Sequence, residues 1–452
     1  MPVLVAAVVS GAILRFGNLG SRDLSPDESA SWIAASAPTI KQVLTVQARA
    51  NPGELGLHDV LLHFWMGLFG DSLIAMRSLS ALTGTLAIFL IYLLVRELLL
   101  NSSDDETGAE QERLTAAIAA LFFAVNLVTI KYSREARMYP LALALTLVQV
   151  WCFLRALRRR EFIDYAGMAI ATALMIIATY TSGLVLIPEG LLLLLLLWRQ
   201  RLRLVGAILI GGAIATGLLL VVVNFILSVH LRGAAPSAQT WEWIQRPAPW
   251  ATITLFSKAI GTYAFPLLVI LGAAGALRSR SGRADAIDFL LLWTFTPPLF
   301  LTLFSYAVRP AFVERYMIST FVPFFALAAL GVFESYPVGF RPAAVALILV
   351  LSVAHIVGWS HKEHGMPWGA ATAFATGNLK PGERIGVMPR NGINVVRYYV
   401  RDAKPDVAVD AIDSEPAPAV VIVTDKFDEA AALEQRYPQL LAFAGELVVR
   451  RR

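Results

Sequence analysis

Residues 204–228 read LVGAILIGGAIATGLLLVVVNFILS and contain no charged side chain. A helix needs about 20 apolar residues to cross the hydrocarbon core of a bilayer, so this stretch predicts a membrane span. The whole chain shares this character, because 57% of its 452 residues are hydrophobic and only 16% are charged. Soluble domains usually carry about 25% charged residues. The composition therefore indicates a polytopic membrane protein and excludes a disordered, collagen-like or coiled-coil chain.

Cysteine content and net charge exclude two further classes. Cys152 is the only cysteine, so no disulfide framework can form within the chain. The net charge is +5, but no basic tract with interleaved aromatic residues occurs, so a nucleic-acid partner is not indicated. In a membrane protein such an excess of cations more often sets topology.

Apolar segments recur along the chain and predict about eleven transmembrane helices. They lie near residues 2–16, 73–95, 114–130, 139–154, 162–180, 183–198, 204–228, 252–276, 288–306, 316–333 and 342–360. The pair Pro297-Pro298 is expected to break the ninth span, because proline removes a backbone donor.

Lysine and arginine are concentrated on one side of this arrangement. One set of loops holds 13 of them in 43 residues: 96–113, 155–160, 199–203, 278–283 and 334–341. The opposite set holds 10 in 99 residues: 17–71, 131–139, 180–182, 229–251 and 307–315. The positive-inside rule places the first set in the cytoplasm, so we expect the N-terminus inside and the C-terminus outside.

Residues 361–452 differ from the rest of the chain. Ile- and Val-rich runs bounded by Pro, Gly and Asp predict strands over 384–388, 407–409, 419–424 and 446–450, with helices over 368–377, 392–399 and 428–437. We therefore predict two domains: a transmembrane domain over 1–360, with a long first outer loop over 17–71, and a soluble α/β domain over 361–452 on the outer face. Within the loop, residues 40–47 and 57–69 suit helices in the membrane interface.

The segment Ser25-Pro26-Asp27-Glu28 has two interpretations. Ser at the N-cap, Pro at the first helical position and Glu three residues after the cap form a capping box, which is a purely structural role. The same helix start would keep a carboxylate ionised, as a general base requires. The interpretations are compatible if Ser25 and Glu28 cap the helix while Asp27 faces a cavity.

Two outer turns combine arginine with tyrosine at span ends. One is Lys131-Tyr132-Ser133-Arg134-Glu135-Ala136-Arg137-Met138-Tyr139, and the other contains Glu314-Arg315-Tyr316. Either turn alone could be a solvated loop with snorkelling cations. Two such turns favour a site for a membrane-bound phosphate, because the guanidinium fork donates paired hydrogen bonds to phosphate. No metal-binding pattern is indicated, so any cofactor stays unknown.

The ordered motifs resemble a known family. Arg15-Phe16, Asp27-Glu28, Phe69-Gly70-Asp71-Ser72, Arg77-Ser78-Leu79-Ser80, the 132–139 turn and Arg315-Tyr316 occur in the order typical of the bacterial branch of glycosyltransferase family 39, in superfamily C. This branch comprises protein-mannosyltransferase-like and aminoarabinose-transferase-like enzymes. The resemblance implies transfer of a sugar from a polyprenyl-phosphate donor to a hydroxyl acceptor, which could be a lipid, a glycan or a protein, on the outer face of the cytoplasmic membrane.

The resemblance also implies roles for particular residues. It makes Asp27 the catalytic carboxylate with Glu28 as its neighbour, and it assigns the donor phosphate to Arg134, Arg137, Tyr139, Arg315 and Tyr316. Many relatives carry His-Pro-Pro in the first loop, whereas this chain has His58-Asp59-Val60. His58 and Asp59 are therefore candidates for the acceptor site or for the geometry of the loop.

Two other classes remain as alternatives. A transporter or flippase for lipid-linked sugars would also have many spans, but it should carry ionisable residues along a path through the membrane. Here the spans are almost free of them, with Glu189 as the main exception. An oligosaccharide ligase using a pyrophosphate-linked donor would have a similar sequence pattern.

Overall fold

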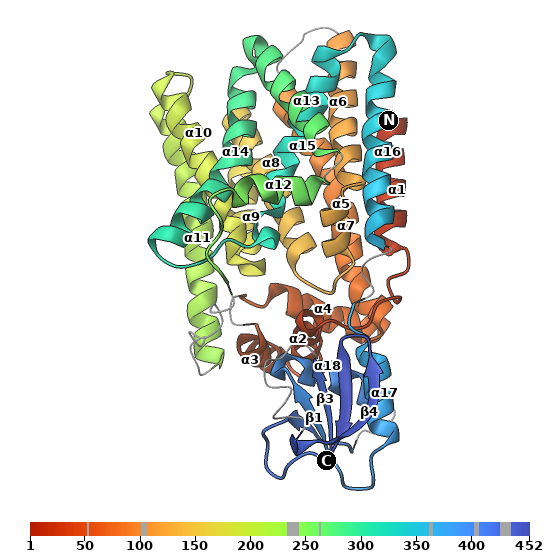
Figure 1. Ribbon diagram of the computed structural model, residues 1–452. Helices are drawn as coiled ribbons and strands as arrows, with labels where there is room; N and C mark the ends of the chain where they lie inside the picture. The colour runs from red at the N-terminus through yellow and green to blue at the C-terminus, as the bar shows by residue number, and fades with distance from the viewer. Residues whose placement is uncertain are drawn as a thin grey trace.

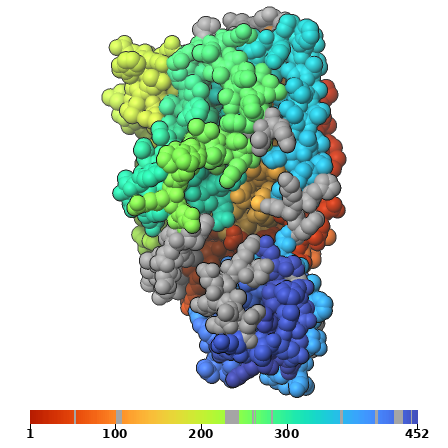
Figure 2. All heavy atoms as spheres, in the orientation of Figure 1, coloured from red at the N-terminus to blue at the C-terminus, as the bar shows by residue number. Residues whose placement is uncertain are grey.

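The structure of the chain is a computed structural model. It describes residues 1–452 except 52–53, 101–105, 233–243, 262–263, 361–364, 402–405 and 425–434. Figure 1 shows a bundle of long helices with a small α/β domain at one end and short helices between them. In the space-filling view the C-terminal domain, in blue, forms a lobe below the helical body (Figure 2).

Each segment expected to span the membrane contains helix. The bundle consists of α1 (Pro2–Phe16), α5 (Leu73–Leu99), α6 (Glu106–Ala124), α7 (Leu127–Ser133), α8 (Tyr139–Arg158), α9 (Phe162–Ala178), η1 (Tyr180–Val185), α10 (Leu186–Trp198), α11 (Leu204–Arg232), α12 (Ala251–Ile260), α13 (Phe265–Arg278), α14 (Arg280–Ala307), η3 (Glu314–Thr320), α15 (Phe321–Ser335), η4 (Val338–Phe340) and α16 (Arg341–Ser360). The prediction of a polytopic helical membrane protein is confirmed.

The expected count of about eleven spans is not confirmed. Within the described ranges, seven helices are long and apolar enough to cross a bilayer, and an eighth span results if α6 and α7, which meet at 64°, count as one. The helices α1, α9 and α13 are apolar but shorter. Length and composition alone therefore leave three of the expected spans without a full-length helix.

One expected span is broken and another is intact. The segment 252–276 divides at Gly261, whose φ of 99° ends α12, and a Cβ there would lie 2.3 Å from Nδ1 of His355. Figure 1 shows α12 lying across the bundle. By contrast, Pro297 and Pro298 lie inside a continuous α14, so the predicted break is wrong. Neighbouring helices commonly tolerate proline within a bundle, and α14 packs on α10 and α15.

The bundle is organised around α15. Its span is 89% buried, whereas those of α11 and α16 are only 22% and 11% buried. The backbones of α13 and α15 approach closely at Gly331, where a Cβ would lie 1.8 Å from the Leu271 carbonyl oxygen. Small residues at such contacts let membrane helices pack tightly. The exposed apolar faces of α11 and α16 are suited to contact with lipid.

The first loop folds into three helices: α2 (Pro26–Ala35), α3 (Ile40–Ala50) and α4 (Leu57–Phe69). The helices expected over 40–47 and 57–69 are therefore present. They lie between the bundle and the C-terminal domain (Figure 1). One hydrophobic cluster joins α2, α4 and α5 to that domain, and it includes Trp32, Leu62, Met76 and Trp368.

The described residues of the C-terminal domain form a five-stranded sheet with two α-helices. Its elements are α17 (Trp368–Gly377), β1 (Ile385–Met388), η5 (Arg390–Gly392), α18 (Ile393–Val400), β2 (Val409–Ala411), β3 (Val420–Thr424), β4 (Gln439–Ala444) and β5 (Leu447–Arg451). The strand order is β2-β1-β3-β5-β4, with β1 parallel to β2 and β3, and β5 antiparallel to β3 and β4. No strand is predicted where β4 lies, and most of the helix expected over 428–437 lies outside the described residues.

Candidate active site

The Glu28 side chain bonds to three separate parts of the chain: the start of α2, α5 and the turn before α8. Its Oε1 accepts hydrogen bonds from Arg77 Nε at 2.7 Å and from the Ala136 amide at 3.0 Å. Its Oε2 accepts from Arg77 Nη2 at 2.9 Å and from the Ser25 amide at 3.0 Å. Two carboxylate oxygens offer about four acceptor positions, so all are occupied. Burial alone would raise the pKa of Glu28, but the hydrogen bonds and charge of Arg77 outweigh burial and lower it.

The capping box predicted at this helix start is present. Ser25 Oγ accepts from the Glu28 amide at 3.2 Å, and Glu28 in turn accepts from the Ser25 amide. Arg77 completes the arrangement by donating to the carbonyls of Leu19, Arg22 and Asp23 at 2.6, 2.8 and 3.0 Å. Glu28 is therefore a buried structural anchor with no remaining position to accept a substrate proton.

Asp27 is one residue away and has a different environment. Its side chain is 55% exposed, and its Oδ2 lies 3.3 Å from Nη1 of Arg315. Its backbone carbonyl accepts from Arg137 Nη1 at 3.0 Å, which fixes the start of α2. The Asp27 carboxylate is thus exposed to solvent, while Arg137 fixes the Asp27 backbone through a hydrogen bond.

Arg137 is buried beneath this carboxylate. It donates to Glu54 Oε1 at 2.7 Å and to Ser31 Oγ at 3.2 Å, in addition to the Asp27 carbonyl. Burial alone would lower the pKa of Arg137, but the charge of Glu54 outweighs burial and raises it. Arg137 is therefore a buried side chain whose terminal nitrogens bond to the first loop.

Tyr139 lies against two arginines. The guanidinium carbons of Arg137 and Arg315 are each 5.9 Å from the centre of its ring, within the range of a cation–π contact. Next to it, a cavity of about 20 Å³, which is room for about one water molecule, is lined by residues that include Arg315, Tyr316, Thr146, Thr179 and Ser182. Arg315, Tyr139 and Tyr316 are thus brought together beside Asp27.

The remaining predicted residues lie elsewhere. Arg134 donates to the Asn18 carbonyl at 3.2 Å, in the turn after α1. Partial burial and the neighbouring charges of Arg22 and Arg77 lower its pKa. His58 and Asp59 are buried in the first turn of α4, with Nδ1 and Oδ1 3.7 Å apart, and their side chains find no hydrogen-bond partner among the described residues.

Several residues of this site received no role from the sequence. Glu54 pairs with Arg137, and burial raises its pKa to about 7 against the opposing charge of Arg137. Glu135 is similar, because burial and the Glu28 carboxylate raise its pKa to about 7. No motif surrounds Glu54, whereas Arg77 belonged to a recognised motif but carried no assigned function. Among the described residues, no group of three or more His, Cys, Asp or Glu side chains could hold a metal ion.

Comparisons with known proteins agree with these motifs. Residues 57–227 match the family model described as dolichyl-phosphate-mannose-protein mannosyltransferase. Two curated relatives are undecaprenyl phosphate-alpha-4-amino-4-deoxy-L-arabinose arabinosyl transferases 1 and 2 of Pseudomonas fluorescens. They are 24% identical over 298 residues and 25% identical over 263 residues. The predicted family resemblance is confirmed.

The matched regions cover 60% and 54% of this chain, and 50% and 41% of the two relatives. The chain thus spans about half the length, or less, of these curated relatives. The structure is similar to that of ArnT from Cupriavidus metallidurans bound to undecaprenyl phosphate, with a TM-score of 0.63 and 13% identity over 99% of this chain and 97% of the other. It also resembles an Archaeoglobus fulgidus oligosaccharyltransferase, with a TM-score of 0.57 and 11% identity over 90% and 64% of the two chains. These likenesses establish the fold.

Proposed function

We propose that this chain is a membrane glycosyltransferase that moves a sugar from a polyprenyl-phosphate donor to a hydroxyl group of a lipid, glycan or protein. The observation that carries the proposal is the pairing of an exposed Asp27 carboxylate with Arg315 at 3.3 Å, beside a Glu28 that is fully engaged. The names of the curated relatives and of the ArnT structure support a donor of the undecaprenyl-phosphate class.

The proposed reaction needs one base and a site for the leaving phosphate. The acceptor oxygen attacks the anomeric carbon and forms the new glycosidic bond while Asp27 takes its proton. The bond between the anomeric carbon and the phosphate oxygen breaks, and the electron pair leaves with the phosphate. Arg315, with Tyr139 and Tyr316 beside it, would stabilise that charge. An in-line displacement of this kind inverts the anomeric centre.

The other candidate residues receive indirect roles in this proposal. Glu28 holds the start of α2, and Arg137 holds the Asp27 backbone, so both would position the base. Arg134 is a second phosphate candidate, in the turn that follows α7, and its side chain is half-buried. His58 and Asp59, which are buried in the first turn of α4, would influence the conformation of the first loop.

The site is proposed to face the outside of the cytoplasmic membrane. Asp27 lies on α2, which packs against α18 of the C-terminal domain. The arginine-rich loops after α8, α10 and α13 lie at the opposite end of the bundle (Figure 1). Together with the positive-inside rule, this arrangement supports an outer-face reaction and an outer-face C-terminal domain.

The experiment is transfer of labelled sugar from a polyprenyl-phosphate donor in membranes that contain the full chain. Asp27→Asn keeps the shape but removes the basicity, so turnover should fall by about 100- to 10,000-fold at unchanged protein level. Arg315→Ala should weaken the use of limiting donor, and Arg315→Lys should restore part of it. An active Asp27→Asn enzyme would exclude this carboxylate as the base. Movement of the donor across the membrane without transfer would favour a flippase.

A further inference from the structure

A second cavity lies at the end of the bundle opposite the C-terminal domain. It has a volume of about 390 Å³ and is formed by the ends of α5, α8 and α10 and the start of α14. Ligand pockets in proteins are about 300–1,000 Å³ in volume. Tyr139 of the candidate active site begins α8, and Leu154 and Arg158 of the same helix line the cavity, 15 to 19 residues further on. At about 1.5 Å per residue, the cavity is roughly 25 Å from the site. It is therefore too distant to belong to that site.

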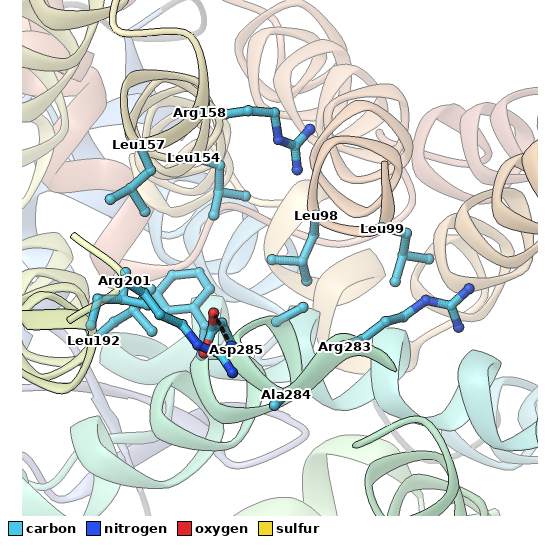
Figure 3. A pocket seen from close by; sticks show the side chains of 13 residues that line it. Leu98, Leu99, Leu154, Leu157, Arg158, Leu192, Arg201, Arg283, Ala284 and Asp285 are labelled. Atoms are coloured by element: carbon cyan, nitrogen blue, oxygen red, sulfur yellow. Dashed lines mark hydrogen bonds and ion pairs between the residues drawn. The ribbon is translucent and has the colours of Figure 1, made fainter. Parts of the chain in front are cut away.

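The cavity combines a cationic rim with an apolar floor. Figure 3 shows Arg158, Arg201 and Arg283 reaching it from different sides, with Asp285 paired to Arg201. The floor is formed by buried apolar side chains, which include Leu98, Leu154, Leu192 and Phe289. Arg283 is paired with Glu334 at 3.3 Å and lies 3.9 Å from Glu112, and Arg158 is paired with Glu97. Arg201 is the most exposed of the three arginines.

The local carboxylates do not require all of these arginines. Asp285 is paired with Arg199 at 3.0 Å as well as with Arg201 at 2.7 Å. Glu97 is similarly close to both Arg158 at 2.9 Å and Arg159 at 4.0 Å. The Arg201 side chain is also 54% exposed. Its charge is therefore available to a further anion without leaving Asp285 unpaired.

The position of the cavity at the end of the helical bundle indicates which class of anion would bind there. The cavity lies where α5, α8 and α10 end and α14 begins, and leucine side chains make up much of its lining. A phosphate group would find guanidinium donors at the rim, and an attached hydrocarbon chain would cover the leucines. Basic pockets between membrane helices on the cytoplasmic side are suited to acidic lipid head groups.

We propose that this cavity binds the phosphate head group of an anionic phospholipid, with Arg201 as its principal ligand. The proposal does not depend on the proposed sugar transfer. The site would fix a membrane lipid between α8, α10 and α14 and so brace the end of the bundle that is remote from the reaction.

The test is native mass spectrometry of the full chain titrated with phosphatidylglycerol and, separately, with phosphatidylcholine. We expect binding that prefers phosphatidylglycerol and is weakened about tenfold in Arg201→Gln, because one charge-assisted hydrogen-bonding group is lost. Arg203→Gln is the matched control, since Arg203 is exposed in the same loop and does not line the cavity. It should bind like the unchanged chain.

A second variant removes space rather than charge. Ala284→Phe places a larger side chain in the lining, keeps every arginine and should also weaken binding of phosphatidylglycerol. Equal binding of the two lipids, or equal weakening by Arg201→Gln and Arg203→Gln, would overturn the proposal. So would full displacement of the lipid by inorganic phosphate at the same concentration, because the site would then be one for a soluble anion.

Discussion

At the scale of single residues, Asp27 and Glu28 show how two adjacent carboxylates can differ. Glu28 and Arg77 are each 2% exposed and bond to one another through two nitrogens, whereas Asp27 is 55% exposed. All five N–H donors of Arg77 are used, by Glu28 and by three backbone carbonyls. The two side chains should therefore fail in different ways when they are neutralised.

Glu28→Gln should destabilise the protein. The substitution leaves the Arg77 charge buried without its counter-charge, which costs about 3 kcal/mol or more. We expect a lower unfolding temperature in detergent and less protein in the membrane. Asp27→Asn is the matched control, because it neutralises the adjacent carboxylate, which is exposed. Its unfolding temperature should stay near that of the unchanged chain. Equal stability of all three proteins would contradict the role of Glu28 as an anchor.

Glu54 should give the protein a pH-dependent stability. Its pKa of about 7 in the folded chain exceeds the ordinary value of 4.5, so the folded state binds more protons than the unfolded state between these values. Stability should therefore fall as the pH rises through this window. Glu54→Gln should flatten the fall in unfolding temperature between about pH 4.5 and 7. Glu161→Gln, at an exposed glutamate, should retain the slope of the unchanged chain.

The exposed residues of the site could be predicted from local sequence patterns more fully than the buried ones. The capping box at Ser25 and the Arg-Tyr pair at 315–316 are local patterns, and the structure contains both. Glu54 could not be found in this way, because it reaches Arg137 across 83 residues of sequence and lies in no periodic segment. Similarly, the burial of Arg137 depends on how the first loop folds over it.

At the scale of elements, the C-terminal domain is fastened to the helix that carries Asp27. Arg401 of the domain lies 3.1 Å from Asp71 Oδ2, and Trp32 of α2 donates to the same oxygen at 3.2 Å. Tyr398 packs edge-on against Trp32, with ring centres 5.3 Å apart. The Leu24 amide, just before α2, donates to the Tyr399 hydroxyl at 2.9 Å. These contacts make the domain a support for the start of α2.

Asp71→Ala should loosen that support. It removes the shared acceptor of Arg401 and Trp32, and lost bonds to a charged group cost about 1.5–3 kcal/mol. Hydrogen exchange of α2 and α18 amides should then be roughly tenfold faster or more. Asp413→Ala serves as the control, because it breaks an exposed pair with Arg390 inside the same domain. Unchanged exchange in α2 would show that the apolar contacts alone hold the domain.

The elements that sequence reasoning misjudged share a cause. Strand β4 pairs with β5 along an antiparallel edge, and its sequence, QLLAFA, lacks the Ile and Val runs that marked the other strands. The continuity of α14 at Pro297 and the break at Gly261 are both decided by neighbouring helices. Local propensity carries no information about such neighbours, whereas strongly apolar segments such as 204–228 identify themselves.

At the scale of the whole molecule, orientation in the membrane is the prediction on which the outer-face reaction depends. The N-terminus lies toward the end of the bundle that is remote from the C-terminal domain (Figure 1). The arginine-rich loops lie at the end remote from the C-terminal domain, so the positive-inside rule puts that end in the cytoplasm. The domain that supports Asp27 should then lie outside.

The single cysteine makes this orientation measurable by labelling. Cys152 is buried in α8, so its reaction with a maleimide should be slow and give little background. Asp413→Cys places a thiol at an exposed position of the C-terminal domain, and Arg160→Cys places one in the turn after α8. The cells should have an intact cytoplasmic membrane and an outer layer that the reagent can cross. A maleimide that cannot cross the cytoplasmic membrane should label Asp413→Cys at once. It should label Arg160→Cys only after that membrane is permeabilised. The reverse order of labelling would show the opposite orientation in the membrane. Asp27 would then lie on the cytoplasmic side, where the proposed outer-face acceptor could not reach it.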